Sequence, residues 1–175
     1  MYGYTVEKSQ LKRYNCNTLY TIGGMETDRI TQSMLDAFQN DFSLSFNDSA
    51  ILFEYFSNYC VVNNIYGTND FDLDEITTGK STQGIDGIAI IINQKIINNT
   101  EDIDLLISLN QTISVKFVLI QTKTSTSFDN TEISNLFTFA RIYFSDDTSI
   151  FCTPEMQKFK KGSLIEYLKI DNTLS

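Results

Sequence analysis

The sequence predicts one α/β domain, a layered structure in which helices pack on a mixed sheet. Two apolar segments rich in β-branched residues, 85–92 and 114–122, have the length and composition of buried strands. Segments with apolar residues at helical spacing precede and follow these strands. The 175 residues of the chain suffice for one hydrophobic core of ordinary size but not for two.

Two helices are expected before the strands. Residues 1–26 show no clear period and are interpreted as an N-terminal extension. The first helix runs from Asp28 to Phe42, where the apolar residues recur at helical spacing. The second covers about 49–62, with Asn47-Asp48-Ser49 as candidate N-caps. It is apolar nearly all round, which predicts burial, and its one charged residue is Glu54.

The strands and the last helix follow a polar connection over 66–84. Asn93-Gln94 is expected to turn the first strand into a second at Lys95–Asn98. Asp104–Leu109 is interpreted as a further short strand before the strong one at 114–122. Asp129 and Glu132 then have the spacing of a capping box, and an amphipathic helix follows up to Phe144. Beyond it we expect a short strand at 147–152, a break at Pro154 and a short helix within 155–170.

Composition excludes several classes of function. There is no histidine, which rules out a Ser-His-Asp triad, His-based acid/base catalysis and a Cys/His zinc site. The three cysteines are widely spaced, as in a reduced compartment, and no signal peptide or membrane span is recognisable. These features predict a cytoplasmic protein without a membrane partner. The net charge of −9 opposes binding of nucleic acid by bulk electrostatics, although residues 8–13 and 158–169 are locally basic.

Polar residues with metal-binding chemistry stand at the ends of the two strong strands. Asp86 precedes the apolar run of the first strand, and Gln121 and Lys123 follow that of the other on one face by alternation. If the two strands are antiparallel neighbours, Asp86 meets Gln121 and Lys123 at one edge of the sheet. Carboxylate and carbonyl oxygens suit a hard cation such as Mg²⁺, and a lysine beside it can stabilise charge on a phosphate. No histidine is needed for this chemistry.

This arrangement resembles the PD-(D/E)XK nuclease superfamily in its Q-x-K, Mrr-like variant. The segments FDLDEITTGKSTQGIDGIAIIINQKII and VKFVLIQTKTSTSFDNTEISNLF are also similar to the N-terminal region of the abortive-phage-infection (AIPR) family. The resemblance covers roughly residues 47–144. It implies a restriction-endonuclease-like core, a mixed β-sheet flanked by helices in the order αβββαβ, with an extra N-terminal helix. The implied division is an N-terminal extension and helix at 1–46, a nuclease core at 47–152 and a C-terminal tail at 153–175.

The resemblance also implies a function and a set of site residues. The function is cleavage of DNA, with RNA as an alternative, by a nuclease of prokaryotic anti-phage defence that uses Mg²⁺ or Mn²⁺. Asp86 matches the metal-binding acid, Gln121 the usual second acid and Lys123 the catalytic lysine. The main-chain carbonyl of Thr122 is a further expected ligand, and Glu54 matches a helix glutamate that assists the metal. Many enzymes that cut both strands act as dimers, so a homodimer is among the expected states.

The chain departs from the family pattern in ways that keep two other hypotheses open. Gln121 is neutral where a charged ligand is usual, which weakens metal binding unless Glu54 contributes. The long segment between Asp86 and Gln121 implies an inserted hairpin, and relatives of this type are much longer. The alternative function is therefore a catalytically inactive nuclease fold that serves as an interaction or nucleic-acid-binding module. A third hypothesis is an α/β domain in which the motif is coincidental.

Overall fold

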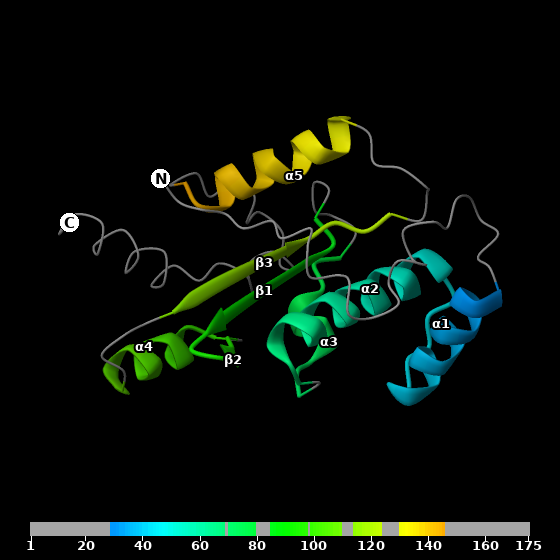
Figure 1. The fold of residues 1–175 in the computed structure, drawn as a ribbon, viewed down its shortest axis with the longest axis horizontal. Coiled ribbons are helices and arrows are strands. Elements are labelled where there is room, and N and C mark those ends of the chain that lie inside the picture. The colour runs from blue at the N-terminus through cyan, green and yellow to red at the C-terminus, as the bar shows by residue number, and fades with distance from the viewer. Residues whose placement is uncertain are drawn as a thin grey trace. The chain divides into compact units, whose positions relative to one another are not determined.

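The computed structural model shows an α/β protein with six stretches of described structure. These stretches are residues 29–68, 70–79, 85–97, 99–109, 114–123 and 130–145. The chain divides into two compact units: Met1–Phe56 with Lys123–Phe128, and Ser57–Thr122 with Asp129–Ser175. Figure 1 shows the elements in chain order. Among the described residues, no helix combines the length and the apolar character that crossing a membrane would need.

The two predicted N-terminal helices are confirmed. Helix α1 spans Arg29–Asp41 and buries Leu35 and Phe38. The ring of Phe38 meets that of Phe56 edge-on, with centroids 5.3 Å apart. Because Phe56 lies on the next helix, this contact ties the two helices together within the first unit.

Helix α2 spans Ser49–Tyr66 and extends beyond its predicted end at residue 62. Its N-terminus is capped by Asp48, whose Oδ1 accepts a hydrogen bond from the amide of Ala50 at 2.9 Å. Its C-terminus is followed by Gly67, which has a positive φ of 82° and donates to the carbonyl of Asn63 at 2.8 Å. A left-handed glycine of this kind ends a helix without steric strain.

A short helix that the sequence did not predict interrupts the connection at 66–84. Helix α3 covers Leu73–Ile76 and starts at Asp72, whose side chain accepts a hydrogen bond from the amide of Asp74. Leu73 and Ile76 are buried. The expectation of a purely polar connection was wrong here because two apolar residues three apart suffice to anchor one helical turn.

The sheet contains the three strands expected at 85–92, 95–98 and 114–122. Strand β1 covers Gly87–Ile92, β2 Lys95–Ile96 and β3 Val115–Ile120. Both pairings are antiparallel and the order is β2-β1-β3. A two-residue turn at Asn93-Gln94 joins β1 to β2, and both residues have positive φ, as the tight hairpin geometry demands. The antiparallel pairing of β1 with β3 that the sequence analysis assumed is therefore present.

The segment 104–109, interpreted from the sequence as a strand, belongs to a helix. Helix α4 spans Thr100–Leu109, and the side chain of Asn99 accepts a hydrogen bond from the amide of Asp102 at 2.8 Å. Acidic residues in the first turn stabilise this helix, because they lie near the positive end of its dipole. Ile103 and Leu106, three apart, then face one apolar cluster. The strand interpretation was wrong because it considered residues 104–109 alone and left out the capped first turn that precedes them.

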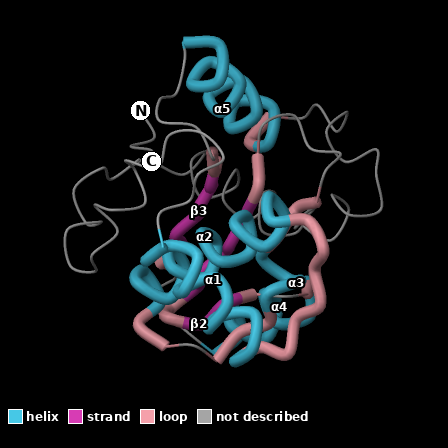
Figure 2. Tube along the Cα trace, turned by 90° about the vertical axis from the view of Figure 1, so that its right-hand side faces the viewer, coloured by secondary structure: helices cyan, strands magenta, loops and turns pink. Residues whose placement is uncertain are grey.

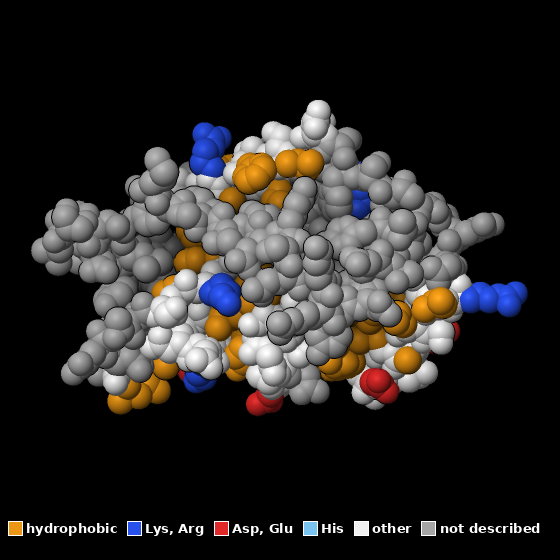
Figure 3. Space-filling model, in the orientation of Figure 1, with side chains coloured by type: hydrophobic (Ala, Val, Ile, Leu, Met, Phe, Trp, Pro, Cys, Tyr) orange, Lys and Arg blue, Asp and Glu red, His pale blue; other side chains and the backbone are white. Residues whose placement is uncertain are grey.

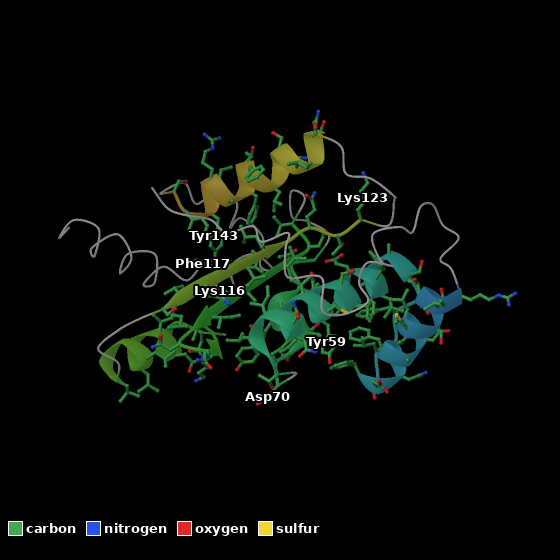
Figure 4. The ribbon with its side chains drawn as sticks, in the orientation of Figure 1. Tyr59, Asp70, Lys116, Phe117, Lys123 and Tyr143 are labelled. Atoms are coloured by element: carbon green, nitrogen blue, oxygen red, sulfur yellow. The ribbon has the colours of Figure 1, made fainter. Side chains whose placement is uncertain are left out.

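Helices cover both faces of β1, all six residues of which are buried. On one face, Ile88 packs with Phe139 and Tyr143 of helix α5, which covers Asn130–Tyr143. Further along that face, Ile90 and Ile92 pack with Ile103 of α4. Figures 1 and 2 show α5 beside β1 and β3, with α3 on the other side of the sheet. Figure 4 shows Phe117 of β3 and Tyr143 of α5 between strand and helix, their ring centroids 6.2 Å apart.

Several expectations fall on residues outside the described ranges. They are the N-terminal extension at 1–26, the cap at Asp129, the strand at 147–152 and the helix within 155–170. Among the described strands all pairing is antiparallel, so the parallel partner that a mixed sheet requires stays a prediction.

Candidate functional site

Asp86 lies where three segments of the second unit converge, immediately before β1. Its amide donates to the carbonyl of Ile120 at 2.9 Å, and its own carbonyl accepts from the amide of Thr78 at 3.1 Å. An isolated bridge pairs Thr77 with Gly87 next to it. The backbone of Asp86 is thus held between β3 on one side and residues 77–78 on the other.

The carboxylate of Asp86 is held by Thr122. Its Oδ2 accepts hydrogen bonds from the Thr122 amide and, at 3.0 Å, from the Thr122 hydroxyl. Partial burial raises the pKa of this carboxyl above its usual value of 3.8, because the charged form loses solvation, while the two bonds from Thr122 act in the opposite direction. The site therefore contains a half-buried acid. Burial destabilises its ionised form, and the two hydrogen bonds from Thr122 stabilise that form.

The contact with Thr122 differs from the strand alternation predicted from sequence. Alternation placed Thr122 on the face opposite Asp86, and Gln121 and Lys123 on the same face. Regular alternation stops at Ile120, where β3 ends, so residues 121–123 no longer follow the period of a strand. The residue of this tripeptide that Asp86 contacts is accordingly Thr122, through its amide and its hydroxyl.

The structure brings together part of the predicted site. Of the five residues named from sequence, Asp86 and Thr122 are in direct contact. Gln121 is half-buried and directly follows β3. Glu54, half-buried on α2, and Lys123 belong to the first unit, whereas Asp86, Gln121 and Thr122 belong to the second. Figure 4 labels Lys123 just beyond the end of β3.

A residue that the sequence analysis did not single out contacts Asp86 from α2. Asn58 is fully buried, and its Nδ2 donates to the carbonyl of Asp86 at 2.7 Å and to the hydroxyl of Thr77 at 3.2 Å. Its Oδ1 is also buried and accepts no hydrogen bond from the described part of the chain. Leaving a buried polar atom unsatisfied costs about 1–3 kcal/mol. The one signal in the sequence was a polar residue in the middle of a largely apolar helix, four residues after Glu54.

The donor set proposed for a metal is made of oxygen atoms, as hard divalent cations prefer. The Thr122 bonds engage Oδ2 of Asp86, so coordination would fall to Oδ1, the second oxygen of this carboxylate. Within the described ranges no group of three or more histidine, cysteine or acidic residues is placed to hold a metal ion. The predicted set contains two carboxylates, Asp86 and Glu54, together with the carbonyl oxygens of Gln121 and Thr122. The chemistry of these donors fits Mg²⁺ or Mn²⁺.

A separate shallow hollow lies on the outer surface of α5. Its lining residues are Asn130, Ile133, Ser134, Phe137, Thr138 and Arg141. Ile133 and Phe137 are exposed, and Figure 3 shows hydrophobic side chains gathered over this helix. The hollow contains none of the predicted site residues, and its side chains include no acid.

Comparison with known proteins adds no relative to this description. No protein-family model, curated protein or solved structure matches the chain.

Proposed function

We propose that this chain is a metal-dependent nuclease of prokaryotic anti-phage defence with a restriction-endonuclease-like core. The substrate is DNA, with RNA as the alternative, and the fold belongs with the N-terminal region of AIPR proteins. The observation that carries the proposal is the contact of Asp86 with Thr122 in the Gln121-Thr122-Lys123 segment. The two motif halves come from strands that pair antiparallel, with Gly87 opposite Ile120. That pairing brings the acid beside the Gln121-Thr122 segment, whose carbonyl oxygens could bind the same cation.

Each proposed site residue has a separate task. Asp86, Gln121, the Thr122 carbonyl and Glu54 would hold the cation through oxygen atoms. A bound Mg²⁺ or Mn²⁺ supplies charge stabilisation at the phosphate and lowers the pKa of a water molecule. Lys123 would orient the attacking water and stabilise the charge that grows on the phosphoryl oxygens. Water attacks phosphorus and loses a proton to solvent, the bond to one ester oxygen breaks, and the departing oxygen takes up a proton from solvent.

The environment of Asp86 supports a cation-binding role. Burial raises the pKa of this carboxyl by penalising its ionised form. A neighbouring cation would offset that penalty, since an opposite charge stabilises the ionised carboxylate. Two hydrogen bonds from Thr122 orient one oxygen of the carboxylate and leave the second to coordinate. A structural acid at the surface would not need this arrangement.

A second candidate function is an inactive nuclease-fold module that binds protein or nucleic acid. The neutral Gln121 favours it because a neutral ligand binds a cation less tightly than a carboxylate does, and the net charge of −9 favours it because it repels the phosphate of a substrate. Metal binding separates the two functions. The module needs no cation, whereas the nuclease depends on it.

The proposed function is tested by cleavage of single- and double-stranded DNA and RNA with Mg²⁺ or Mn²⁺. Asp86→Asn and Lys123→Ala are each expected to lower the rate at least 100-fold, because each removes charge stabilisation at the phosphate. Lys116→Ala is the matched control, since Lys116 is an exposed lysine on β3 outside the site. Its rate should equal that of the wild type. Folded wild type that neither cleaves nor binds Mn²⁺ in calorimetry would establish the inactive module instead.

A further inference from the structure

Asn58 connects helix α2 to the backbone of Asp86. Its side chain is fully buried, and Nδ2 reaches the Asp86 carbonyl at 2.7 Å. A carbonyl oxygen can only accept hydrogen bonds, so the atom that faces it must be the amide nitrogen. The orientation of the Asn58 amide is therefore determined by this contact, and Oδ1 is turned to the other side.

The other side of the Asn58 amide packs over Gly87. A Cβ atom at residue 87 would overlap Cγ, Oδ1 and Nδ2 of Asn58, so the close approach requires glycine. Oδ1 is buried there without a hydrogen-bond donor from the described residues. An apolar side chain of similar size, such as leucine, would fill this space without an unsatisfied oxygen. Leucine would, however, lose the bonds from Nδ2 to the Asp86 carbonyl and the Thr77 hydroxyl, so these two contacts are what the asparagine supplies.

The geometry points to Asn58 as a positioning residue that holds Asp86 in place for the metal site. This inference rests on the proposed function and extends it to a residue on α2. The carbonyl of Asp86 accepts from the Asn58 side chain and from the Thr78 amide, its amide donates to Ile120, and its carboxylate accepts from Thr122. With both sides of its backbone fixed, rotation about the Asp86 backbone is confined. The carboxylate is thereby kept against Thr122.

The first test compares Asn58→Leu with Val62→Ala, a fully buried control one helical turn further along α2. The amide of Thr122 donates to the Asp86 carboxylate, so its NMR chemical shift should follow the titration of Asp86. We expect this pH-dependent shift to fall by half or more in Asn58→Leu and to persist in Val62→Ala. Affinity for Mn²⁺ alone, measured by calorimetry, should fall at least tenfold in Asn58→Leu, as on loss of other groups that orient a ligand.

The outcomes separate this inference from the proposed function. If Asn58→Leu keeps the full pH-dependent shift of the Thr122 amide and the wild-type Mn²⁺ affinity, Asn58 only fills space and the inference is overturned. If the wild type binds no Mn²⁺, the proposed function fails. The pH-dependent chemical shift of the Thr122 amide then decides alone whether Asn58 positions Asp86.

A second comparison guards against a variant that simply fails to fold. Gly87→Ala should be strongly destabilised, because its methyl group overlaps Asn58. Adding Asn58→Ala makes room for that methyl group and should restore much of the lost thermal stability. The double variant should nevertheless keep the reduced pH-dependent shift of the Thr122 amide, because the Asn58 donor is missing and the Asp86 carbonyl retains the Thr78 amide alone. Recovery of both the stability and the titration would show that size alone matters at residue 58.

Discussion

At the scale of single residues, the candidate site contains an acid that the fold disfavours. Burial raises the pKa of Asp86, so the folded protein binds this proton more tightly than the unfolded chain does. The resulting stabilisation is fully present below the unfolded pKa, near 3.8, and is lost as the pH rises through the higher folded value. Near neutral pH, the ionised Asp86 therefore lowers the stability of the protein relative to a neutral side chain of the same shape.

The substitution Asp86→Asn tests this cost. An asparagine oxygen can still accept the two bonds from Thr122 while carrying no charge. In EDTA at pH 7 we expect the variant to be more stable than the wild type by roughly 0.5–2 kcal/mol, the usual size of a single stabilising substitution. The difference should shrink as the pH falls toward 4. Urea unfolding of both proteins across this pH range measures it.

The control for this substitution is Asp70→Asn. Asp70 is exposed in the connection before α3, so its replacement should change stability little at any pH. An Asp86→Asn protein that is less stable than the wild type at all pH values would contradict the assignment of a desolvated acid.

At the scale of secondary structure, the hairpin between β1 and β2 is under strain. Asn93 and Gln94 have φ values of 46° and 68°, in the region that glycine adopts most easily. Asparagine tolerates this conformation better than glutamine does. Gln94→Gly should therefore raise the free energy of unfolding by about 1 kcal/mol, the cost of a left-handed residue with a side chain.

The matching control lies next to it in the chain. Lys95 is exposed but belongs to β2, where glycine weakens a strand. Lys95→Gly should lower stability while Gln94→Gly raises it, both measured by thermal unfolding. Destabilisation by both changes would show that the turn does not hold the conformation described here.

What the sequence could predict depended on how local the deciding interactions are. The strands at 85–92 and 114–122 were recognisable because β-branched composition is a local signal, and α1 because its apolar spacing is. Helix α4 was missed because its cap at Asn99 precedes the window that suggested a strand. Asn58 could not be found at all. Its partner Asp86 is 28 positions away, and one polar residue among several in a largely apolar helix does not reveal which backbone it will meet.

At the scale of the whole molecule, net charge opposes the proposed substrate. With −9 overall, the chain repels a polyanion and lacks the bulk attraction on which most nucleic-acid binders rely. Under the proposed function, binding would therefore depend on the local groups at the site and on the cation that they would hold. The sequence revealed this conflict, but only the contact between Asp86 and Thr122 indicates where the compensating charge would bind.

Nucleic-acid binding is accordingly expected to require a divalent cation. Fluorescence anisotropy with labelled DNA in Ca²⁺, which also takes oxygen ligands, should show an affinity at least tenfold higher than in EDTA. Asp86→Asn should remove most of this difference. Equal binding in Ca²⁺ and EDTA would mean that the cation does not bridge the protein to phosphate.

The distance along the chain between Asp86 and Thr122 also matters during synthesis. The two residues are 36 positions apart, and ribosomes add roughly 5–20 residues per second. For an interval on the order of seconds, β1 has left the ribosome while the strand that pairs with it has not. All six residues of β1 are buried in the finished fold. The nascent chain therefore exposes an aggregation-prone segment with high β-propensity throughout that interval. Expression with abundant chaperones, which bind such exposed segments, should therefore raise the soluble yield of this protein.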